Sequence, residues 1–380
     1  MNIKSIVNKR LKKHRYNAVK QSYLSLYQKM MRYGDSHFNQ TTSLSKENEK
    51  EWLKKWQKYD SKISPLSYRV FSRYIGHNLN IFPMELLIGI VEPVLNPEFY
   101  RNYYNDKNSL DQIFCGLSLP KIYMRNINGV DYDGEYKRID SPLSFAEKEN
   151  RPQKIILKPA RDCSGHGVRL LVWTNDCYCD NENNQLSIDY LKSTYKSDFL
   201  IQEAITQSSF LAQFNPTSVN TIRIATYRGV YSGEVHVINS VLRIGASGKN
   251  VDNAHAGGMF TGINKENGKL GTYVCNYLGH TQNEFNNIDF AHNDFTIPGW
   301  EKVYAFAIEV SERLIHHNLV AMDIALDESN NPKLIEINVG GFGGWVFQFT
   351  TGSVFGEFTD EVMEYCWRKY KNLAFEITYK

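Results

Sequence analysis

Two alternating segments near the end of the chain, residues 320–326 and 333–339, constrain the fold most strongly. In each segment apolar residues occupy every second position, and turn-forming residues lie between the two segments. Because successive side chains of a strand point to opposite faces, this pattern predicts an antiparallel hairpin with one buried face. The residues expected on that buried face are Met322, Ile324, Leu326, Ile335, Ile337 and Val339.

The other face of this hairpin carries two acidic residues. If the hairpin turns at its midpoint, Asp323 lies directly opposite Glu336, and Asn338 shares the face of Glu336. Like charges directly opposite each other are destabilising, so the pair needs a cation. Two carboxylates and a carboxamide are hard oxygen ligands of the kind that suits Mg²⁺. The alternative is a polar hairpin face in solvent. The apolar opposite face and four following glycines favour a cleft; these are Gly340, Gly341, Gly343 and Gly344.

A second feature with chemical meaning occupies residues 154–173. It predicts a strand, a short loop that contains Ser164, Gly165 and Gly167, and a second strand. It is not a Walker A loop, because it neither leads into a helix nor ends in Gly-Lys-Ser/Thr. Glycines let backbone amides approach an anion closely, and Lys158 adds a positive charge from the first strand. The loop is therefore a candidate phosphate site, and an ordinary glycine-bearing hairpin is the alternative.

Composition restricts the class of protein. A chain of 380 residues favours two or three structural units, and 42% hydrophobic with 22% charged residues excludes a disordered chain. No apolar run reaches the roughly 18 residues of a membrane helix, and no secretory signal is recognised. The six cysteines form no disulfide framework or zinc pattern, which favours a cytoplasmic protein. A net charge of +3 gives no reason to expect nucleic acid as a partner.

Charge is nevertheless uneven along the chain. The first 34 residues contain nine Lys or Arg residues and no acidic residue, and apolar residues recur in them near helical spacing. This pattern predicts a basic amphipathic helix that either lies on an anionic membrane surface or packs its apolar stripe on the protein body. The apolar residues concerned are Ile3, Val7, Leu11, Val19, Tyr23, Leu26 and Met30.

Taken together, the lysine with its glycine loop and the acidic hairpin resemble the ATP-grasp superfamily over residues 103–371. The resemblance implies ATP and Mg²⁺ as cofactors, with Asp323, Glu336 and Asn338 as the metal ligands. It also implies that Lys107 and Lys158 are the nucleotide lysines and that residues 199–205 are the strand that holds adenine. The residues expected to bind ATP are Lys107, Lys158, Ser164, Gly165, Gly167, Gln202 and Glu203.

The segments 215–223, 242–245, 251–258 and 336–338 resemble, more narrowly, the sugar-transfer-associated ATP-grasp group. By this resemblance Arg223 and Arg243, on adjacent predicted strands, are the expected catalytic residues. Arginine in such a position can hold a carboxylate or a transferring phosphoryl group; ordinary surface arginines are the alternative. The expected substrate-binding residues are Asn253, His255, Gly257 and Gly258. No acidic residue lies between Ala204 and Arg223 to hold the ribose, and Gln207 or Gln213 is the candidate substitute.

The expected fold class is α+β: an ATP-grasp fold, whose two α+β subdomains clasp ATP, after a mostly helical N-terminal region. The expected divisions are 1–102 for the helical region and 103–371 for the catalytic domain, with a tail at 372–380. Within the catalytic domain, about 152–205 is expected to clasp the nucleotide and about 206–371 to hold metal and substrate.

The expected function is ATP-dependent ligation of a carboxylate to an amine through an acyl phosphate, in surface polysaccharide (capsule or O-antigen) biosynthesis. The expected partners are a small-molecule carboxylate and an amine, with a nucleotide sugar or sugar acid among the candidates. Membrane contact through residues 1–33 would place the protein at the inner face of the membrane. Two other functions stay open: an ATP-grasp kinase that phosphorylates a small molecule or sugar, and a nucleotide-binding scaffold in a polysaccharide assembly complex.

Overall fold

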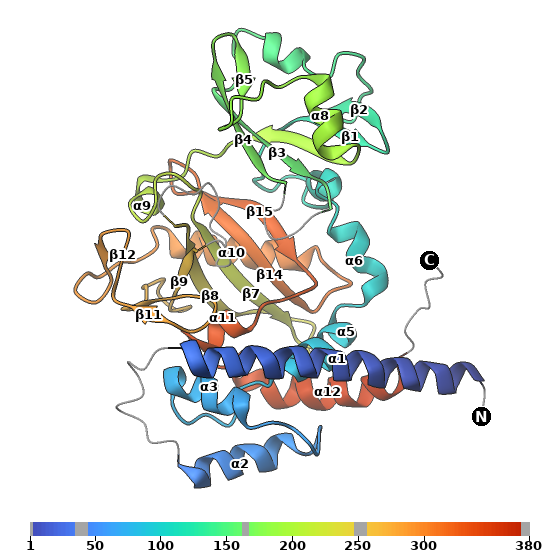
Figure 1. Cartoon of the computed structure of the whole chain (residues 1–380), viewed down its shortest axis with the longest axis vertical. Helices are drawn as coiled ribbons and strands as arrows, with labels where there is room; N and C mark the ends of the chain where they lie inside the picture. Colours follow the sequence, from blue (N-terminus) through green and yellow to red (C-terminus); the bar gives the residue numbers. More distant parts are fainter. Residues whose placement is uncertain (1–2, 35–44, 162–166, 247–256, 374–380) are drawn as a thin grey trace.

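A computed structural model describes residues 3–34, 45–161, 167–246 and 257–373, and their side chains from residue 7 onward. The chain forms a small β-domain, a larger β-domain and a layer of helices, which follow one another along the long axis of the molecule (Figure 1). Helices and antiparallel sheets are both present, as the predicted α+β class requires. In the described residues, no helix is both long enough and apolar enough to cross a bilayer.

The larger domain is built on a seven-stranded antiparallel sheet of order β11-β10-β9-β8-β7-β14-β15. Its strands are β7 (Thr221–Arg228), β8 (Val235–Ile244), β9 (Met259–Gly262), β10 (Val274–Cys275), β11 (Thr281–Gln282), β14 (Leu319–Leu326) and β15 (Pro332–Asn338). A separate two-stranded ribbon joins β12 (Glu284–Phe285) to β13 (Ile288–Asp289), and the short helix α9 (Ser209–Ala212) precedes β7.

The two faces of this sheet have different neighbours. Ile222, Ile224 and Met322 point to the face covered by α10 (Trp300–Glu312), where they share one apolar core. Ala225 and Ala321 point to the opposite face and belong to the core shared with the N-terminal helices. The helical layer lies at one end of this sheet (Figure 1). By strand alternation Arg223 shares the face of Ala225, and Asp323, which is paired with Arg223, shares the face of Ala321.

The predicted hairpin is the β14–β15 pair, and Asp323 lies opposite Glu336 as expected. The reason differs from the simple midpoint argument. A hairpin that turned at the predicted midpoint would pair Leu326 with Lys333, but Leu326 pairs with Pro332, one residue earlier. A β-bulge between Asp323 and Ile324 shifts the register back, so Asp323 pairs with Glu336. The bulge also changes which residue of β15 enters the core. Ile335 was expected there, but Leu334 is buried and Ile335 is only partly buried.

The small domain contains a six-stranded antiparallel sheet of order β2-β1-β6-β3-β4-β5. Its strands are β1 (Ile122–Ile127), β2 (Val130–Asp133), β3 (Lys154–Pro159), β4 (Arg169–Thr174), β5 (Cys177–Cys179) and β6 (Phe199–Glu203). The sheet begins earlier than the predicted subdomain start at about 152, because β1 pairs with β6 across a long sequence separation. One face packs against α8 (Ile188–Tyr195) around Leu157, Leu191 and Ile201, and η4 (Ser144–Glu147) closes the same core with Phe145.

The N-terminal helices and the last helix form the helical layer. They are α1 (Ile3–Tyr33), α2 (Lys46–Trp56), α3 (Leu66–Ile75), α4 (Met84–Leu86), the π-helical turn η2 (Leu87–Val91), α5 (Glu92–Leu95) and α12 (Thr359–Asn372). The next helix, α6 (Glu98–Tyr104), runs beside the larger sheet toward the small domain (Figure 1), and its Tyr104 packs in the core that contains α10. The long helix predicted at the N-terminus is α1, and its second half packs on the protein body, with Tyr27 and Met30 buried beside Phe71. Lys12 Nζ donates to the carbonyl oxygens of Tyr370 and Lys371, so α1 also contacts the end of α12 (Figure 1).

Candidate active site

Asp323 of β14 holds two arginines from the neighbouring strands. Arg223 of β7 donates from Nε and Nη2 to the two carboxylate oxygens of Asp323, both at 2.8 Å, and Arg243 of β8 donates from Nη1 at 3.0 Å. Direct pairing of Arg223 with Asp323 in the sheet register brings these side chains together. Burial raises the pKa of Asp323, but the two guanidinium groups outweigh it and lower the pKa to about 2. The carboxylate is therefore ionised throughout the neutral range.

Glu336 lies beside Asp323, on the neighbouring strand β15. Lys107 Nζ lies 3.3 Å from Glu336 Oε1, and Glu336 is paired with Asp323 across the hairpin. Burial and the positive charge of Lys107 lower the pKa of Lys158 to about 7, although the charge of Glu336 acts in the opposite direction. Lys107 also donates its backbone N–H to the carbonyl of Ala160, two residues after Lys158, so the three charged residues lie near one another although they come from different parts of the chain. The structure brings the two predicted nucleotide lysines to the predicted metal hairpin.

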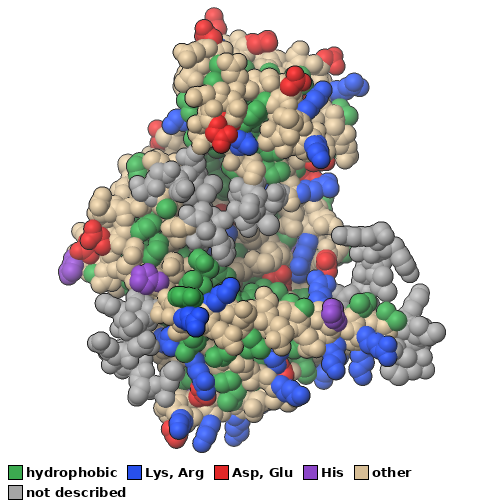
Figure 2. Space-filling model, in the orientation of Figure 1, with side chains coloured by type: hydrophobic (Ala, Val, Ile, Leu, Met, Phe, Trp, Pro, Cys, Tyr) green, Lys and Arg blue, Asp and Glu red, His purple; other side chains and the backbone are tan. Residues whose placement is uncertain are grey.

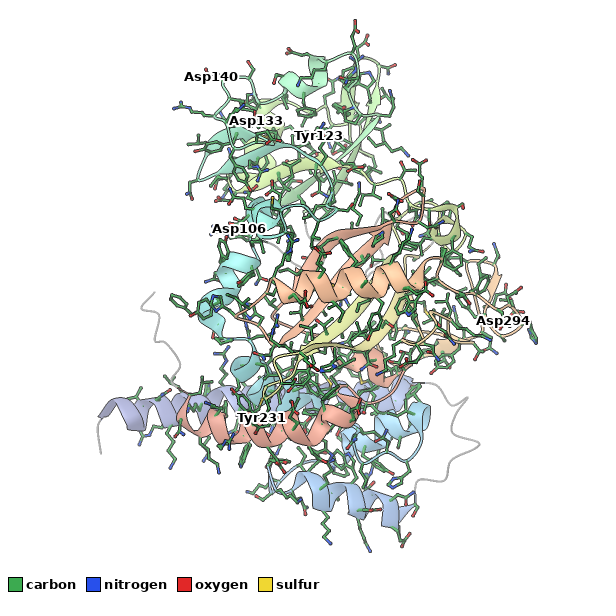
Figure 3. All side chains as sticks on the ribbon, turned by 180° about the vertical axis from the view of Figure 1, so that it is seen from behind. Asp106, Tyr123, Asp133, Asp140, Tyr231 and Asp294 are labelled. Atoms are coloured by element: carbon green, nitrogen blue, oxygen red, sulfur yellow. The ribbon has the colours of Figure 1, made fainter. Side chains whose placement is uncertain are left out.

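Lys107 is held in place by the small domain. It opens the 3₁₀ turn η3 (Lys107–Ser109), which leads into α7 (Leu110–Ile113), and its backbone N–H donates to the carbonyl of Ala160 at the end of β3. Below the turn lies the fully buried Arg125, whose Nη2 is 2.7 Å from Asp111 Oδ2. Figure 3 shows Asp106, the residue before Lys107, at the junction between the two β-domains. An ion pair between the buried Arg125 and the partly exposed Asp111 therefore fixes the segment that carries Lys107.

Gln202 and Glu203, predicted to hold adenine, end strand β6 at the same junction. Gln202 is buried and pairs with Ile156, so it lies on the sheet face that also carries Lys158. The Glu203 carboxylate accepts both from Lys333 Nζ, at 3.0 Å to each oxygen, and from the backbone N–H of Lys121. Since Lys333 belongs to β15, this ion pair joins the two β-domains beside the site.

The predicted glycine loops are described only in part. Ser164 and Gly165 of the phosphate loop, and Asn253 and His255 of the substrate loop, lie outside the described residues. Gly167 has φ +70°, and its carbonyl accepts a hydrogen bond from the Tyr195 hydroxyl at 2.6 Å. Gly257 has φ +93° and Gly258 is buried, just before β9, which pairs with the strand of Arg243.

The sequence did not reveal how the glycine run after β15 is held. The backbone N–H groups of Gly341 and Phe342 donate to the two carboxylate oxygens of Glu92, at 2.9 and 3.1 Å. Arg101 pairs with the same carboxylate at 3.3 Å. The sequence contains one signal for this contact, the acidic residue Glu92 within the apolar run 82–95. A carboxylate buried with such a run needs hydrogen-bond partners.

The chemistry of the hairpin residues fits Mg²⁺. In the described residues, no cluster of three His, Cys, Asp or Glu side chains could hold a metal, so an ion here would use the two carboxylates, Asn338, phosphate and water. The Asn338 Nδ2 atom is buried without a hydrogen-bond partner in the described part of the chain, so no hydrogen bond of this atom there fixes the orientation of the carboxamide. Asp323 and Glu336 each already hold a cationic side chain, so both positions of the hairpin favour positive charge.

Charge at this junction also suits a polyphosphate. Three cationic side chains, Arg223, Arg243 and Lys107, lie around two carboxylates, and the Lys158 amine lies beside them. The excess of positive charge, partly buried between two domains, favours an anion with several phosphate groups.

Comparison with known proteins identifies the family. The family model of sugar-transfer associated ATP-grasp proteins matches residues 91–363, and the chain belongs to this family. It therefore has the ATP-grasp fold. A search of curated proteins found no match.

Solved ATP-grasp structures are similar at low identity. The ligase PsnB, solved with a phosphomimetic variant of its minimal precursor, Mg and ADP, is 11% identical over 71% of this chain and 61% of that one, with a TM-score of 0.38. The VanG D-Ala:D-Ser ligase from Enterococcus faecalis is 12% identical over 72% and 62%, with a TM-score of 0.40. The L-amino acid ligase from Bacillus licheniformis is 13% identical over 70% and 48%, with a TM-score of 0.38. The chain thus spans about three fifths or less of each of these proteins.

Proposed function

We propose that the protein is an ATP-dependent ligase that joins a carboxylate to an amine with release of ADP and phosphate. The observation that carries this proposal is the convergence of Lys107 and Lys158 on the hairpin of Asp323 and Glu336. These groups come from both β-domains, and Arg223 and Arg243 complete the arrangement. Membership of the ATP-grasp family supports the same reading.

Each residue has a role in this proposal that follows from its charge and position. Lys107 and Lys158 neutralise the nucleotide phosphates, and the end of β6 with Gln202 and Glu203 holds the adenine. Arg223 and Arg243 hold the acceptor carboxylate and the phosphoryl group that is transferred, because a guanidinium group matches both anions in shape and charge.

Magnesium, held by Asp323, Glu336 and Asn338, would supply charge neutralisation on the phosphate oxygens. The chain's own contribution is to position and to stabilise charge, which accounts for most catalysis of phosphoryl transfer. A carboxylate oxygen attacks the γ-phosphorus and ADP leaves. The amine then attacks the acyl carbon, phosphate leaves and an amide remains.

The family description points to the substrates. We propose that one reactant is a sugar acid or an amino acid joined to a sugar. A nucleotide sugar is a further candidate for this reactant. The proposed setting is the biosynthesis or modification of surface polysaccharide at the cytoplasmic side of the membrane.

The test is an ADP-release screen of sugar acids against amines, with the product masses determined. We expect ADP release that needs both reactants and a product whose mass equals acid plus amine minus water. Glu336→Gln is the control, because it removes one negative charge from the site, and the ion pair that it breaks, with Lys107, lies within the site. ADP release with a stable phosphate ester as the product would contradict the ligase and identify a kinase.

A further inference from the structure

A groove lies on the helical layer, away from the proposed active site. It has a volume of about 840 Å³ and is formed by α1, α12 and the turn after α2. Its lining is Asn8, Lys9, Lys12, Lys13, Tyr16, Tyr59, Asp60, Ile90, Trp367, Tyr370, Lys371, Asn372 and Leu373. The helical layer and the small β-domain lie at opposite ends of the larger domain (Figure 1).

The groove has an apolar floor. Ile90 at its base is buried, and Tyr59 packs edge-on against Trp367 with ring centroids 5.9 Å apart. Tyr16 is partly buried in the same core. A surface of this kind accepts hydrocarbon or the apolar part of an amphiphile, because it removes apolar area from water.

The rim of the groove is cationic. Lys9, Lys13 and Lys371 are exposed around it, and Asp60 is the acidic side chain in the lining. Asp60 accepts from the Tyr16 hydroxyl at 2.8 Å and forms an ion pair with Lys20, so its negative charge is already neutralised. Figure 2 shows blue Lys and Arg side chains gathered along the edge where α1 and α12 lie in Figure 1. The groove therefore presents positive charge above an apolar floor.

Lys12 differs from Lys9, Lys13 and Lys371, because its amine binds backbone carbonyls of the groove itself. Its Nζ donates to the carbonyls of Tyr370 and Lys371, at 2.9 and 3.2 Å, and these carbonyls lie at the C-terminal end of α12. A cation at this end satisfies helix carbonyls that have no partner within the helix. Lys12 thus joins the two walls of the groove and fixes its shape.

The apolar stripe of α1 is not available for insertion into a membrane as a whole. Tyr23, Leu26 and Met30 of the predicted stripe pack in the core of the protein. Val7 and Leu11, at the outer end of the helix, are 38% and 42% exposed. Any attachment must therefore use the basic rim and this short outer end, and it must depend mainly on charge.

We propose that the groove binds an anionic phospholipid surface. In this arrangement Lys9, Lys13 and Lys371 contact headgroup phosphates, and the aromatic floor accepts the apolar part of one lipid. Charge complementarity favours this occupant, because the exposed rim is basic and the floor is apolar. The proposal does not rest on the ligase function, since the groove shares no residue with the proposed active site.

The experiment is sedimentation of the full chain with vesicles of phosphatidylcholine, with and without phosphatidylglycerol, at low and high salt. We expect binding to the anionic vesicles alone and its loss at high salt, because exposed charges are screened. The triple variant Lys9→Gln, Lys13→Gln, Lys371→Gln should bind about 100-fold more weakly, at about fivefold for each lysine near the surface.

The matched control removes the same charge elsewhere. Lys46, Lys50 and Lys54 are exposed on α2 and outside the groove, and their replacement by Gln should leave vesicle affinity within about twofold of wild type. Both variants are first shown to melt like the wild type. Soluble dihexanoyl phosphatidylglycerol should bind the wild type more tightly than glycerol phosphate does.

Three results would overturn the proposal. They are no binding of wild type to anionic vesicles at low salt, an equal loss in both triple variants, and equal affinity for the short-chain lipid and glycerol phosphate. The last result would identify a small-anion site without a lipid component.

Discussion

Lys107 and Glu336 form an ion pair with 3.3 Å between Nζ and Oε1, and this pair joins the segment before the small sheet to the last strand of the large sheet. Lys107 is bound at the same time to the end of β3 through its backbone. This pair therefore links the small domain to the acidic hairpin close to Lys158, in addition to the ion pair between Glu203 and Lys333. A nucleotide phosphate that takes Lys107 as its partner would leave the Glu336 carboxylate available for a metal.

Glu336→Gln should abolish turnover and leave stability almost unchanged. The Glu336 side chain is 29% exposed, and among the described residues its ion pair is with Lys107. Partly exposed pairs of this kind contribute about 0–1 kcal/mol to stability. Turnover with the substrates found in the ADP-release screen and a urea unfolding curve measure the two effects. Wild-type turnover at ordinary Mg²⁺ concentration would contradict the metal assignment.

Asp323→Asn should abolish turnover and also destabilise the protein. The Asp323 side chain is 4% exposed and binds two arginines, so its neutralisation removes a buried negative charge that both guanidinium groups contact. Loss of one partner of a buried ion pair typically costs about 3–5 kcal/mol. The difference in unfolding free energy between this variant and Glu336→Gln is the measurement. Equal stability of the two variants would show that Asp323 does not hold the arginines in solution.

Lys158→Met should weaken nucleotide binding and remove an uptake of protons. The pKa of Lys158 is lowered to about 7 in the free protein, so at pH 8 most molecules carry the neutral amine there. Bound phosphate favours the charged form, and binding should therefore take up close to one proton at this pH. Calorimetry with a non-hydrolysable ATP analogue, in buffers of different ionisation enthalpy, measures this uptake. Equal uptake by wild type and variant would exclude Lys158 as a phosphate contact.

The same lysine gives a stability prediction with a defined sign. Its pKa is lower in the folded protein than the ordinary value of 10.5, so between about pH 7 and 10.5 the unfolded chain binds more protons. The contribution of Lys158 to stability therefore rises with pH in this window, by at most about 1.4 kcal/mol per pH unit. The difference between wild type and Lys158→Met in urea unfolding at pH 7, 8 and 9 isolates this contribution. A difference that does not change with pH would mean that Lys158 is not desolvated.

Glu85→Gln tests the core beneath α1. Glu85 is fully buried, its Oε2 accepts from the Tyr27 hydroxyl at 2.9 Å, and burial raises its pKa from 4.5 to about 7. Because the folded protein holds this proton more tightly, the contribution of Glu85 falls as pH rises from 4.5 to 7, by on the order of 3 kcal/mol. The variant should therefore gain stability relative to wild type between pH 5 and pH 8. An unchanged difference between the two pH values would show that Glu85 has an ordinary pKa.

Several features of the site could be predicted from the sequence because they depend on local patterns. The assumed midpoint of the hairpin predicted Asp323 opposite Glu336, and the sheet register confirms this pair, although a β-bulge is needed to produce it. The alternating segments around Arg223 and Arg243 are neighbouring antiparallel strands, as predicted. Alternation of this kind is a strong signal, since each strand has one face in the core.

Other features depend on contacts between distant parts of the chain, and local patterns do not encode them. The bulge that buries Leu334 in place of Ile335 follows from the packing of the sheet against α10. The bidentate pairing of Arg223 with Asp323 joins residues 100 positions apart. Strand β1 belongs to the small sheet through its pairing with β6, so this sheet includes residues well before 152.

The most direct test of the proposed ligase follows the oxygen atoms of the carboxylate. The reaction is run with the substrate pair found in the ADP-release screen, and with both carboxylate oxygens labelled with ¹⁸O. An acyl-phosphate route transfers one labelled oxygen to the released phosphate and leaves the other in the amide, and mass spectrometry of the phosphate detects it. The proposed function predicts one ¹⁸O atom in each phosphate released. Unlabelled phosphate, with both labelled oxygens retained on the organic product, would contradict it.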